Sequence, residues 1–193
     1  MCVSSQFQPD PRRFNQCCPR VLQIGTKPNK NVVRLVKSLA GLEVELDIVG
    51  PIDAELMAAL EDTKLRYQSF GRLSDEEILE RYREADIVAF VSTEEGFGMP
   101  IVEAQCIERV CVTSNCSSMP EVAGAGACLV DPLDTQSIRA GFLRVIRDAV
   151  YREQLIAAGR ENRTRFDAER IARQYSELYH LVFLESRSGR HLA

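Results

Sequence analysis

The sequence predicts an α/β fold built on a doubly wound, Rossmann-like parallel sheet. From residue 21 onward, short apolar runs alternate with segments of helical pattern, as in strands that are joined by covering helices. After residue 134 the pattern is helical only, which predicts a C-terminal group of helices. With 193 residues the chain is long enough to bury a substantial core.

The elements follow in chain order. We expect strands at Val21–Ile24, Val44–Val49, Leu65–Phe70, Ile87–Val91, Val110–Thr113 and Ala127–Val130. Helices are expected at Asn31–Leu39, Ala54–Leu60, Ser74–Glu84, Pro100–Cys106, Pro120–Val122, Thr135–Asp148, Val150–Arg165 and Ala168–Glu185. Ser74, followed three positions later by Glu77, forms a capping box. Residues 1–20 contain three prolines and no periodicity and form a linker or arm; residues 21–185 form the domain, and residues 186–193 a polar tail.

Composition narrows the class of protein. A hydrophobic share of 45% and a charged share of 27% are typical of a soluble globular protein. The net charge of -4 gives no reason to expect nucleic acid or an anionic membrane as a partner. No segment approaches the roughly 20 apolar residues of a membrane span, and no apolar signal core is present. Seven scattered cysteines without metal spacing indicate a reducing, cytoplasmic location.

The stretch Ile87–Glu103 is the most informative part of the chain. An apolar strand runs into a loop with Gly96 and Gly98, and Pro100 suits the first turn of the following helix. The loop residues Gly96, Phe97, Gly98 and Met99 therefore bring free N–H groups and a helix N-terminus to one place. This arrangement predicts an anion site.

A second loop is expected to face the first. In a sheet of order 3-2-1-4-5-6, the first and fourth strands are neighbours where the strand order reverses, and ligands bind beyond their carboxyl ends. The first strand ends in the segment 25–31, which contains Gly25, Lys27 and Lys30. Lys30 is the better candidate to hold a diphosphate, and Lys27 stays open; alone, each would be read as a solvated surface lysine.

Two glutamates flank the predicted phosphate pocket. Glu95 precedes the glycine loop, and Glu103 lies about one turn into the helix. Carboxylates do not bind phosphate but accept hydrogen bonds from hydroxyls, so a ligand with both phosphate and sugar is indicated. The alternative is that neither residue binds a ligand and that Glu95 is a surface glutamate and Glu103 an ordinary helix glutamate. Burying the Glu103 carboxylate among apolar neighbours, however, would be costly without hydrogen-bond donors.

Weaker candidates lie nearby. Ser117 and Ser118 follow the fifth strand and are candidates for a hydroxyl or amide contact to phosphate. Arg72 is a candidate contact to a base, although a plain surface arginine is as plausible a reading. The chain has no GxGxxG motif, no P-loop and no Asp-x-Asp pair. The sequence therefore disfavours an enzyme that uses a nicotinamide cofactor, hydrolyses ATP or transfers a group with the help of a metal ion.

Taken together, these segments resemble the C-terminal, donor-binding domain of a glycosyltransferase family 4 (group 1) enzyme of GT-B architecture. The resemblance covers about Val21 to Leu181. It is carried by Ile24-Gly25 with Pro28-Asn29-Lys30-Asn31, by Phe70-Gly71-Arg72-Leu73-Ser74, by Glu95 to Ala104, by Ser117 to Gly124 and by Leu129 to Pro132.

The resemblance implies a retaining enzyme that uses a nucleotide-diphosphate sugar as substrate and needs neither a cofactor nor a metal. Glu103 would bind the ribose and Glu95 the donor sugar. Lys30 and the backbone of Phe97–Met99 would hold the diphosphate, and Gly71-Arg72-Leu73 would border the base. We take Glu95 and Lys30 as the catalytic candidates. Leu73, like Arg72, is a binding candidate.

The chain departs from the family pattern in several places. Glu108 and Val110 stand where Gly and Pro are usual, Ala125 replaces an acidic residue, and the usual arginine after the first glycine is absent. Family members also carry an N-terminal acceptor domain, to which the last helix returns. We therefore expect a donor half that works with a missing N-terminal domain, in cis or in trans, and is inactive or weak alone.

Two other readings remain open. One is a non-catalytic nucleotide-sugar binding or interaction module. The other, less favoured, is a glycoside hydrolase that uses Glu95 and Glu103 as its paired carboxylates.

Overall fold

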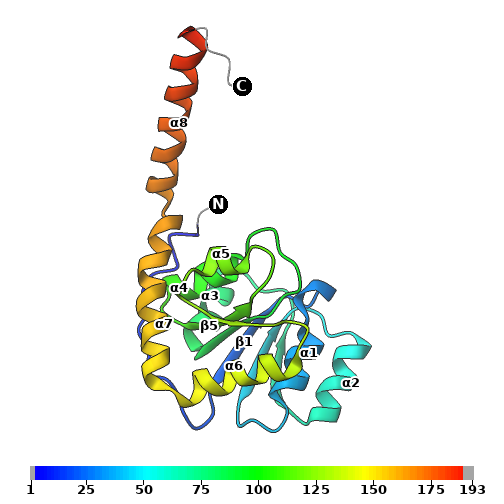
Figure 1. Cartoon of the computed structure of the whole chain (residues 1–193). Helices are drawn as coiled ribbons and strands as arrows, with labels where there is room; N and C mark the ends of the chain where they lie inside the picture. The colour runs from blue at the N-terminus through cyan, green and yellow to red at the C-terminus, as the bar shows by residue number, and fades with distance from the viewer. Residues whose placement is uncertain (1–2, 189–193) are drawn as a thin grey trace.

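The computed structural model describes residues 3–188 and contains one parallel sheet of six strands (Figure 1). The strands are β1 (Arg20–Ile24), β2 (Glu45–Val49), β3 (Arg66–Phe70), β4 (Ile87–Phe90), β5 (Val110–Ser114) and β6 (Cys128–Val130). Their spatial order is β3-β2-β1-β4-β5-β6, and every neighbouring pair is parallel. The predicted fold class and strand order are confirmed.

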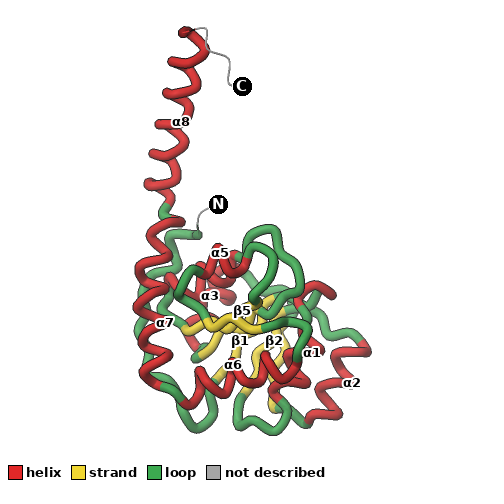
Figure 2. The backbone as a smooth tube through the Cα atoms, in the orientation of Figure 1, coloured by secondary structure: helices red, strands yellow, loops and turns green. Residues whose placement is uncertain are grey.

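Helices cover both faces of this sheet (Figure 2). They are α1 (Val32–Leu39), α2 (Ala54–Thr63), α3 (Asp75–Glu84), α4 (Met99–Cys106), α5 (Met119–Ala123), α6 (Thr135–Arg147), α7 (Ala149–Asn162) and α8 (Ala168–Ser188). Short 3-10 turns lie at Pro28–Lys30 and Arg163–Phe166, so the helix predicted to reach Arg165 ends earlier, at Asn162. Conversely, α8 runs to Ser188, into the segment predicted as a tail; residues 189–193 lie outside the described part.

The core follows from strands that are apolar on both sides. In β4, Ile87 and Ala89 pack with α1, α2 and α6, whereas Val88 and Phe90 pack with α3, α4 and α5. Successive side chains of a strand point to opposite faces, so an unbroken apolar run serves two layers. This packing holds the carboxyl ends of β1 and β4 side by side.

The turn after α4 contains the clearest departure from the usual local rules. Glu108 has a φ of 61°, the left-handed conformation that favours glycine. Its carboxylate accepts two hydrogen bonds from Arg160 of α7, from Nε at 2.8 Å and from Nη2 at 2.7 Å. The expectation that Glu108 occupies a glycine-type position is confirmed, and Arg160 anchors it.

The two ends of the chain behave differently. The N-terminal arm lacks regular structure over residues 3–19 but is fastened to the domain, for example by Arg109, which donates to the backbone oxygen of Asp10. Helix α8 instead projects away from the domain (Figure 1). Within residues 3–188, no helix combines the length and the apolar character needed to cross a membrane.

Candidate functional site

The loops after β1 and β4 meet at the carboxyl edge of the sheet. The backbone N–H of Thr93 donates to the backbone oxygen of Asn29 at 2.8 Å. The Asn29 side-chain amide donates back, to the backbone oxygen of Glu94 at 3.0 Å and to Oε1 of Glu95 at 3.2 Å. The geometric expectation on which the predicted site depends, that these two loops face each other, is therefore confirmed.

Lys30 lies at the centre of this meeting point. Its ammonium nitrogen is 2.6 Å from Oε1 of Glu95, and the two side chains are only 18% and 15% exposed. The same nitrogen lies 4.6 Å from the centroid of the Phe90 ring. Its aliphatic stem runs over Gly25, where a Cβ would come within 3.3 Å of the lysine Cε, and Gly25 also has a φ of 82°. Gly25 thus permits both the turn and the path of the lysine.

The glycine loop presents a row of unused backbone donors. Within residues 3–188, no acceptor is recorded for the N–H groups of Gly96, Phe97, Gly98 and Met99, and Pro100 carries no N–H. Gly98 caps α4 with a φ of 110°. Free N–H groups at the start of a helix are the usual setting for an anion.

Ser117 and Ser118 hold the same loop from the other side. The Ser118 hydroxyl lies 2.9 Å from the backbone oxygen of Glu95 and 2.8 Å from that of Phe97. Ser117 Oγ accepts from the backbone N–H of Glu95 at 3.2 Å and lies 2.8 Å from its oxygen. The Ser118 hydroxyl, predicted as a ligand contact, is thus engaged with the loop carbonyls in this structure.

Glu103 is half-buried on α4 and has a tyrosine partner. The hydroxyl of Tyr82, on α3, donates to Oε2 of Glu103 at 2.5 Å. Burial raises the pKa of Glu103, and the hydrogen bond from Tyr82 offsets part of that rise. Burial also holds the pKa of Tyr82 well above its usual range, as do the charge of Glu103 and the bond to it, so the phenol is the donor.

The remaining predicted residues lie at the margins of the meeting point. Lys27 is exposed and borders a separate hollow of about 300 Å³ between α1 and α2. Arg72 is exposed, and Leu73 packs partly against the core below α3. The backbone N–H of Lys30 donates to the backbone oxygen of Lys27 at 2.8 Å. Among the described residues, no side-chain hydrogen bond or ion pair joins any of these three residues to Lys30 or Glu95.

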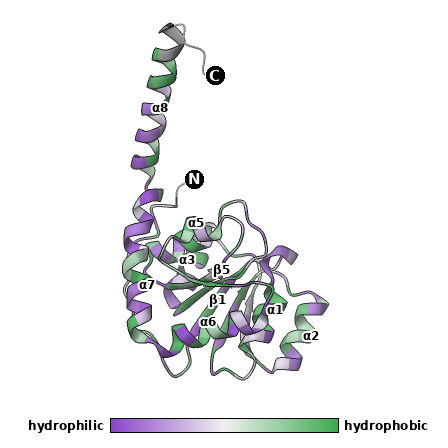
Figure 3. Cartoon of the chain, in the orientation of Figure 1, coloured by the Kyte–Doolittle hydropathy of each residue, from purple (hydrophilic) through white to green (hydrophobic). Residues whose placement is uncertain are grey.

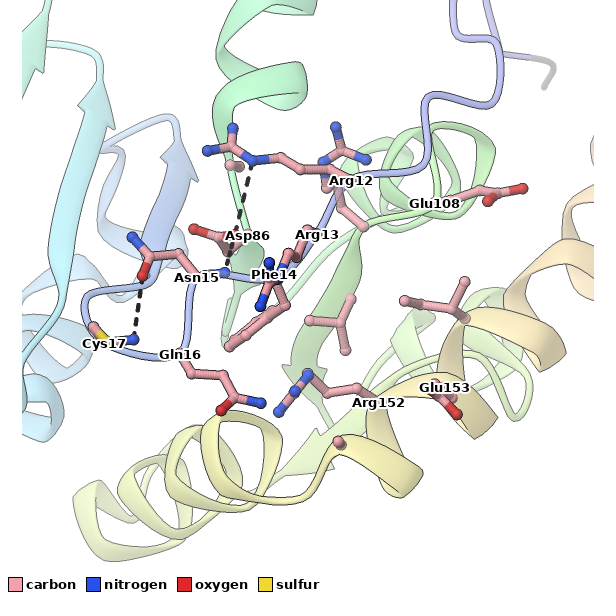
Figure 4. Close-up of a pocket in the computed structure, with 15 residues that line it drawn as sticks. Arg12, Arg13, Phe14, Asn15, Gln16, Cys17, Asp86, Glu108, Arg152 and Glu153 are labelled. Carbon is pink, nitrogen blue, oxygen red and sulfur yellow. Dashed lines mark hydrogen bonds and ion pairs between the residues drawn. The ribbon is translucent and has the colours of Figure 1, made fainter.

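A larger hollow, of about 780 Å³, lies at the opposite edge of the sheet (Figure 4). Two of its arginines, Arg12 and Arg152, already have partners. Arg12 donates to the carbonyls that end α3, and Arg152 donates to the carbonyls of Val145 and Ile146 near the end of α6. Arg152 also lies 3.9 Å from the centroid of the Phe14 ring. These cations cap helix C-termini, so we assign this hollow a structural role.

No cluster of three or more potential metal ligands occurs within the described part of the chain. Cys106, Cys111 and Cys116, which are spaced five residues apart, belong to no such group: Cys111 is buried, whereas Cys106 and Cys116 are half-buried. Tyr82 and Asn29 were not predicted as site residues. Tyr82 had no signal beyond a helical apolar position, and Asn29 makes contacts across the chain that spacing does not reveal.

Comparison with known proteins places this geometry in a family. Residues 13–162 match the model of the family described as glycosyl transferases group 1. The chain belongs to this family. Among its curated relatives, O-antigen chain mannosyltransferase B of Escherichia coli is 31% identical over 175 residues, covering 83% of this chain and 45% of the relative. MMP alpha-(1->4)-mannosyltransferase of Mycolicibacterium hassiacum is 32% identical, covering 72% of this chain and 36% of the relative.

This glycosyl transferases group 1 chain therefore spans less than half the length of these two relatives. Solved structures show which half it resembles. The C-terminal domain of a group 1 family protein from Francisella tularensis matches with a TM-score of 0.70 at 21% identity, covering 84% of this chain and 96% of that one. An Anabaena protein solved with UDP and glucose matches with a TM-score of 0.75 at 22% identity, covering 85% of this chain and 48% of its own. The fold is that of the C-terminal domain of a GT-B enzyme.

Proposed function

We propose that this chain is the donor-binding half of a retaining glycosyltransferase that uses a nucleotide-diphosphate sugar. The observation that carries the proposal is the row of four free N–H groups, Gly96 to Met99, beside the ammonium of Lys30. Amides and an ammonium group that converge at a helix N-terminus suit a diphosphate. Family membership supports glycosyl transfer over glycoside hydrolysis.

In this proposal each residue has one role. The ammonium of Lys30 has three N–H donors, so it can contact the diphosphate while one donor stays on Glu95. As the glycosidic bond breaks, negative charge develops on the leaving diphosphate, where Lys30 and the loop amides stabilise it. Glu95 accepts from hydroxyls of the sugar, and Glu103 accepts from the ribose. Arg72 and Leu73 border the base.

The sugar is proposed from the relatives. The curated relatives named above are mannosyltransferases, so mannose is the first donor sugar to test. The donor itself is a substrate, and the proposal includes no cofactor or metal. It also includes a cytoplasmic location, since scattered cysteines suit a reducing compartment.

The proposal assigns a partner to helix α8. Tyr175, Leu178, Tyr179 and Leu181 are 52–70% exposed along it, and Figure 3 shows apolar segments on the projecting helix. Apolar side chains in such number on a lone helix indicate a covered surface. Because the relatives are more than twice as long as the matched region, we propose that an N-terminal acceptor domain covers α8, in cis or in trans.

The alternative is a binding module without catalysis, which shares the nucleotide site but not the need for an acceptor domain. Turnover separates the two. With a verified donor and acceptor, adding the complementary N-terminal domain should restore transfer that the chain alone lacks. Leu178→Glu should block that restoration without weakening nucleotide binding, and Arg173→Glu on the same helix serves as a charge control. No turnover with any complementary domain would favour the binding module.

Calorimetric titration tests the site itself. UDP, GDP and ADP, then UDP-glucose, GDP-mannose and ADP-glucose, should reveal one preferred base and a gain from the sugar. Glu103→Ala should weaken the nucleotide and the nucleotide sugar alike, whereas Glu95→Ala should weaken only the sugar-bearing form. Equal losses for both ligands in both variants would refute the assigned roles.

A further inference from the structure

Tyr82 is the largest fully buried polar side chain next to the candidate site. It is 0% exposed, and its hydroxyl donates to Oε2 of Glu103 from a different helix. A phenol that meets an ionised carboxylate at 2.5 Å forms a strong, charge-assisted hydrogen bond. The bond fixes the orientation of Glu103, because the phenol has a single proton to give.

The other oxygen of Glu103 is left for a ligand. Within the described residues no donor is recorded for Oε1, and this atom is not among the buried polar atoms that lack a partner. Oε1 therefore reaches solvent. One oxygen of the Glu103 carboxylate is therefore bound by Tyr82, and the other is accessible to solvent. Glu103 lies one turn after the free amides of the glycine loop.

The N-terminal arm covers the tyrosine. The ring of Phe7 meets the ring of Tyr82 edge to face, with centroids 5.2 Å apart and an interplanar angle of 82°. Such pairs stabilise a ring orientation beyond the area they bury. Phe7 lies 75 residues away in the sequence, so only the folded arm brings it to this place.

From these contacts we infer that Tyr82 is a positioning residue that fixes Glu103 as the acceptor for the vicinal ribose hydroxyls, and that Phe7 holds Tyr82 in place. The inference rests on the proposed function, in which Glu103 binds the ribose. It makes Tyr82 a determinant of the preference for ribose over 2′-deoxyribose, although the tyrosine touches no ligand. A carboxylate left free to rotate would accept from one hydroxyl or from water with little preference.

The test compares a nucleoside diphosphate with its 2′-deoxy form, using whichever of UDP, GDP or ADP the wild-type chain binds best. The wild type should prefer the ribose form. Tyr82→Phe should weaken ribose-form binding by about tenfold, the range of a charged hydrogen bond, and change 2′-deoxy binding by less than about twofold. Tyr67→Phe, which removes the same atom from an exposed ring, is the matched control and should bind as wild type.

Each outcome is decisive. An unchanged ribose preference in a folded Tyr82→Phe variant, or equal losses for both ligands, would overturn the inference and leave the proposed function standing. A wild-type chain that binds none of the nucleotides would refute both. If Tyr82→Phe does not fold, Phe7→Leu replaces it, since it keeps the hydroxyl and removes only the ring contact. Phe7→Leu should also lower the preference for the ribose form over the 2′-deoxy form. A Phe7→Leu variant that keeps the full wild-type preference would overturn the inference.

Discussion

Replacing Lys30 by methionine isolates the contribution of one ammonium group to phosphate binding. Methionine keeps most of the stem that runs over Gly25 and removes the charge that lies 2.6 Å from Glu95. A charge-assisted hydrogen bond contributes about 1.5–3 kcal/mol. Because Lys30 already bonds Glu95 in the free protein, we take the lower part of that range, which corresponds to a loss of roughly 10- to 30-fold in nucleoside diphosphate affinity.

The same change should alter stability only slightly. Glu95 keeps the Asn29 amide at 3.2 Å, and its side chain retains 15% exposure. We expect a loss of about 1 kcal/mol in the free energy of unfolding, which lowers the melting temperature by roughly 2–4 °C for a chain of this size.

Lys27→Met is the matched control, since it removes the same group three residues away, where the side chain is exposed. Calorimetric titrations with the diphosphate and with the free nucleoside provide the assay. Lys30→Met should weaken the diphosphate and spare the nucleoside, and Lys27→Met should change either by less than about twofold. Equal losses in the two variants, or an equal loss for the nucleoside, would refute the assignment of Lys30 to the phosphates.

Three further predictions follow from the geometry. Glu108→Ala and Glu108→Gly both lose the ion pair with Arg160, but only alanine is strained in the left-handed conformation of this residue. Urea denaturation should therefore find Glu108→Ala about 1 kcal/mol less stable than Glu108→Gly. The reverse order of stability would contradict the left-handed strain at this position. Burial raises the pKa of Glu103, and a protonated carboxyl no longer serves as the ribose acceptor. As the pH decreases, affinity for the free nucleoside should therefore begin to fall at a higher pH than the protonation of an exposed glutamate would produce. Titrations in which the affinity stays constant down to the pH range in which an exposed glutamate is protonated would exclude this prediction. Gly98 has a φ of 110°, and a Cβ added there would lie 3.1 Å from the Ile101 side chain, so thermal melting of Gly98→Ala should show a loss of about 1–2 kcal/mol in the free energy of unfolding, together with weaker diphosphate binding. A melting curve like that of the wild type would contradict this prediction.

Several local features were predictable because their causes are local. The capping box of Ser74 and Glu77 forms as the spacing predicts, and the Ser74 hydroxyl accepts from the Glu77 N–H. The apolar run at 87–90 became a strand buried on both faces for the same reason that it was recognised, namely that it offers no polar side. The left-handed turn at Glu108 lies where the family pattern usually has Gly, the residue that this conformation favours.

Contacts between distant segments were not predictable in the same way. The sequence pointed to Lys30 and Glu95 as neighbours only through the expected strand order, and gave no sign that the two would pair with each other. Ser118 was taken as a ligand contact, whereas its hydroxyl lies against the loop carbonyls. Lys27 and Lys30 looked equivalent as residue types, and the folded loop exposes one and half-buries the other.

By itself, the sequence determined the order of the strands, the glycine-rich loop and the presence of two carboxylates beside it. These depend on periodicity and on backbone conformation, which act over a few residues. Only the tertiary structure decided that Glu103 accepts a hydrogen bond from Tyr82 and that the ring of Phe7 packs against the ring of Tyr82. Such partners are chosen by packing between elements that lie far apart in the chain, and no local pattern records which side chains will meet.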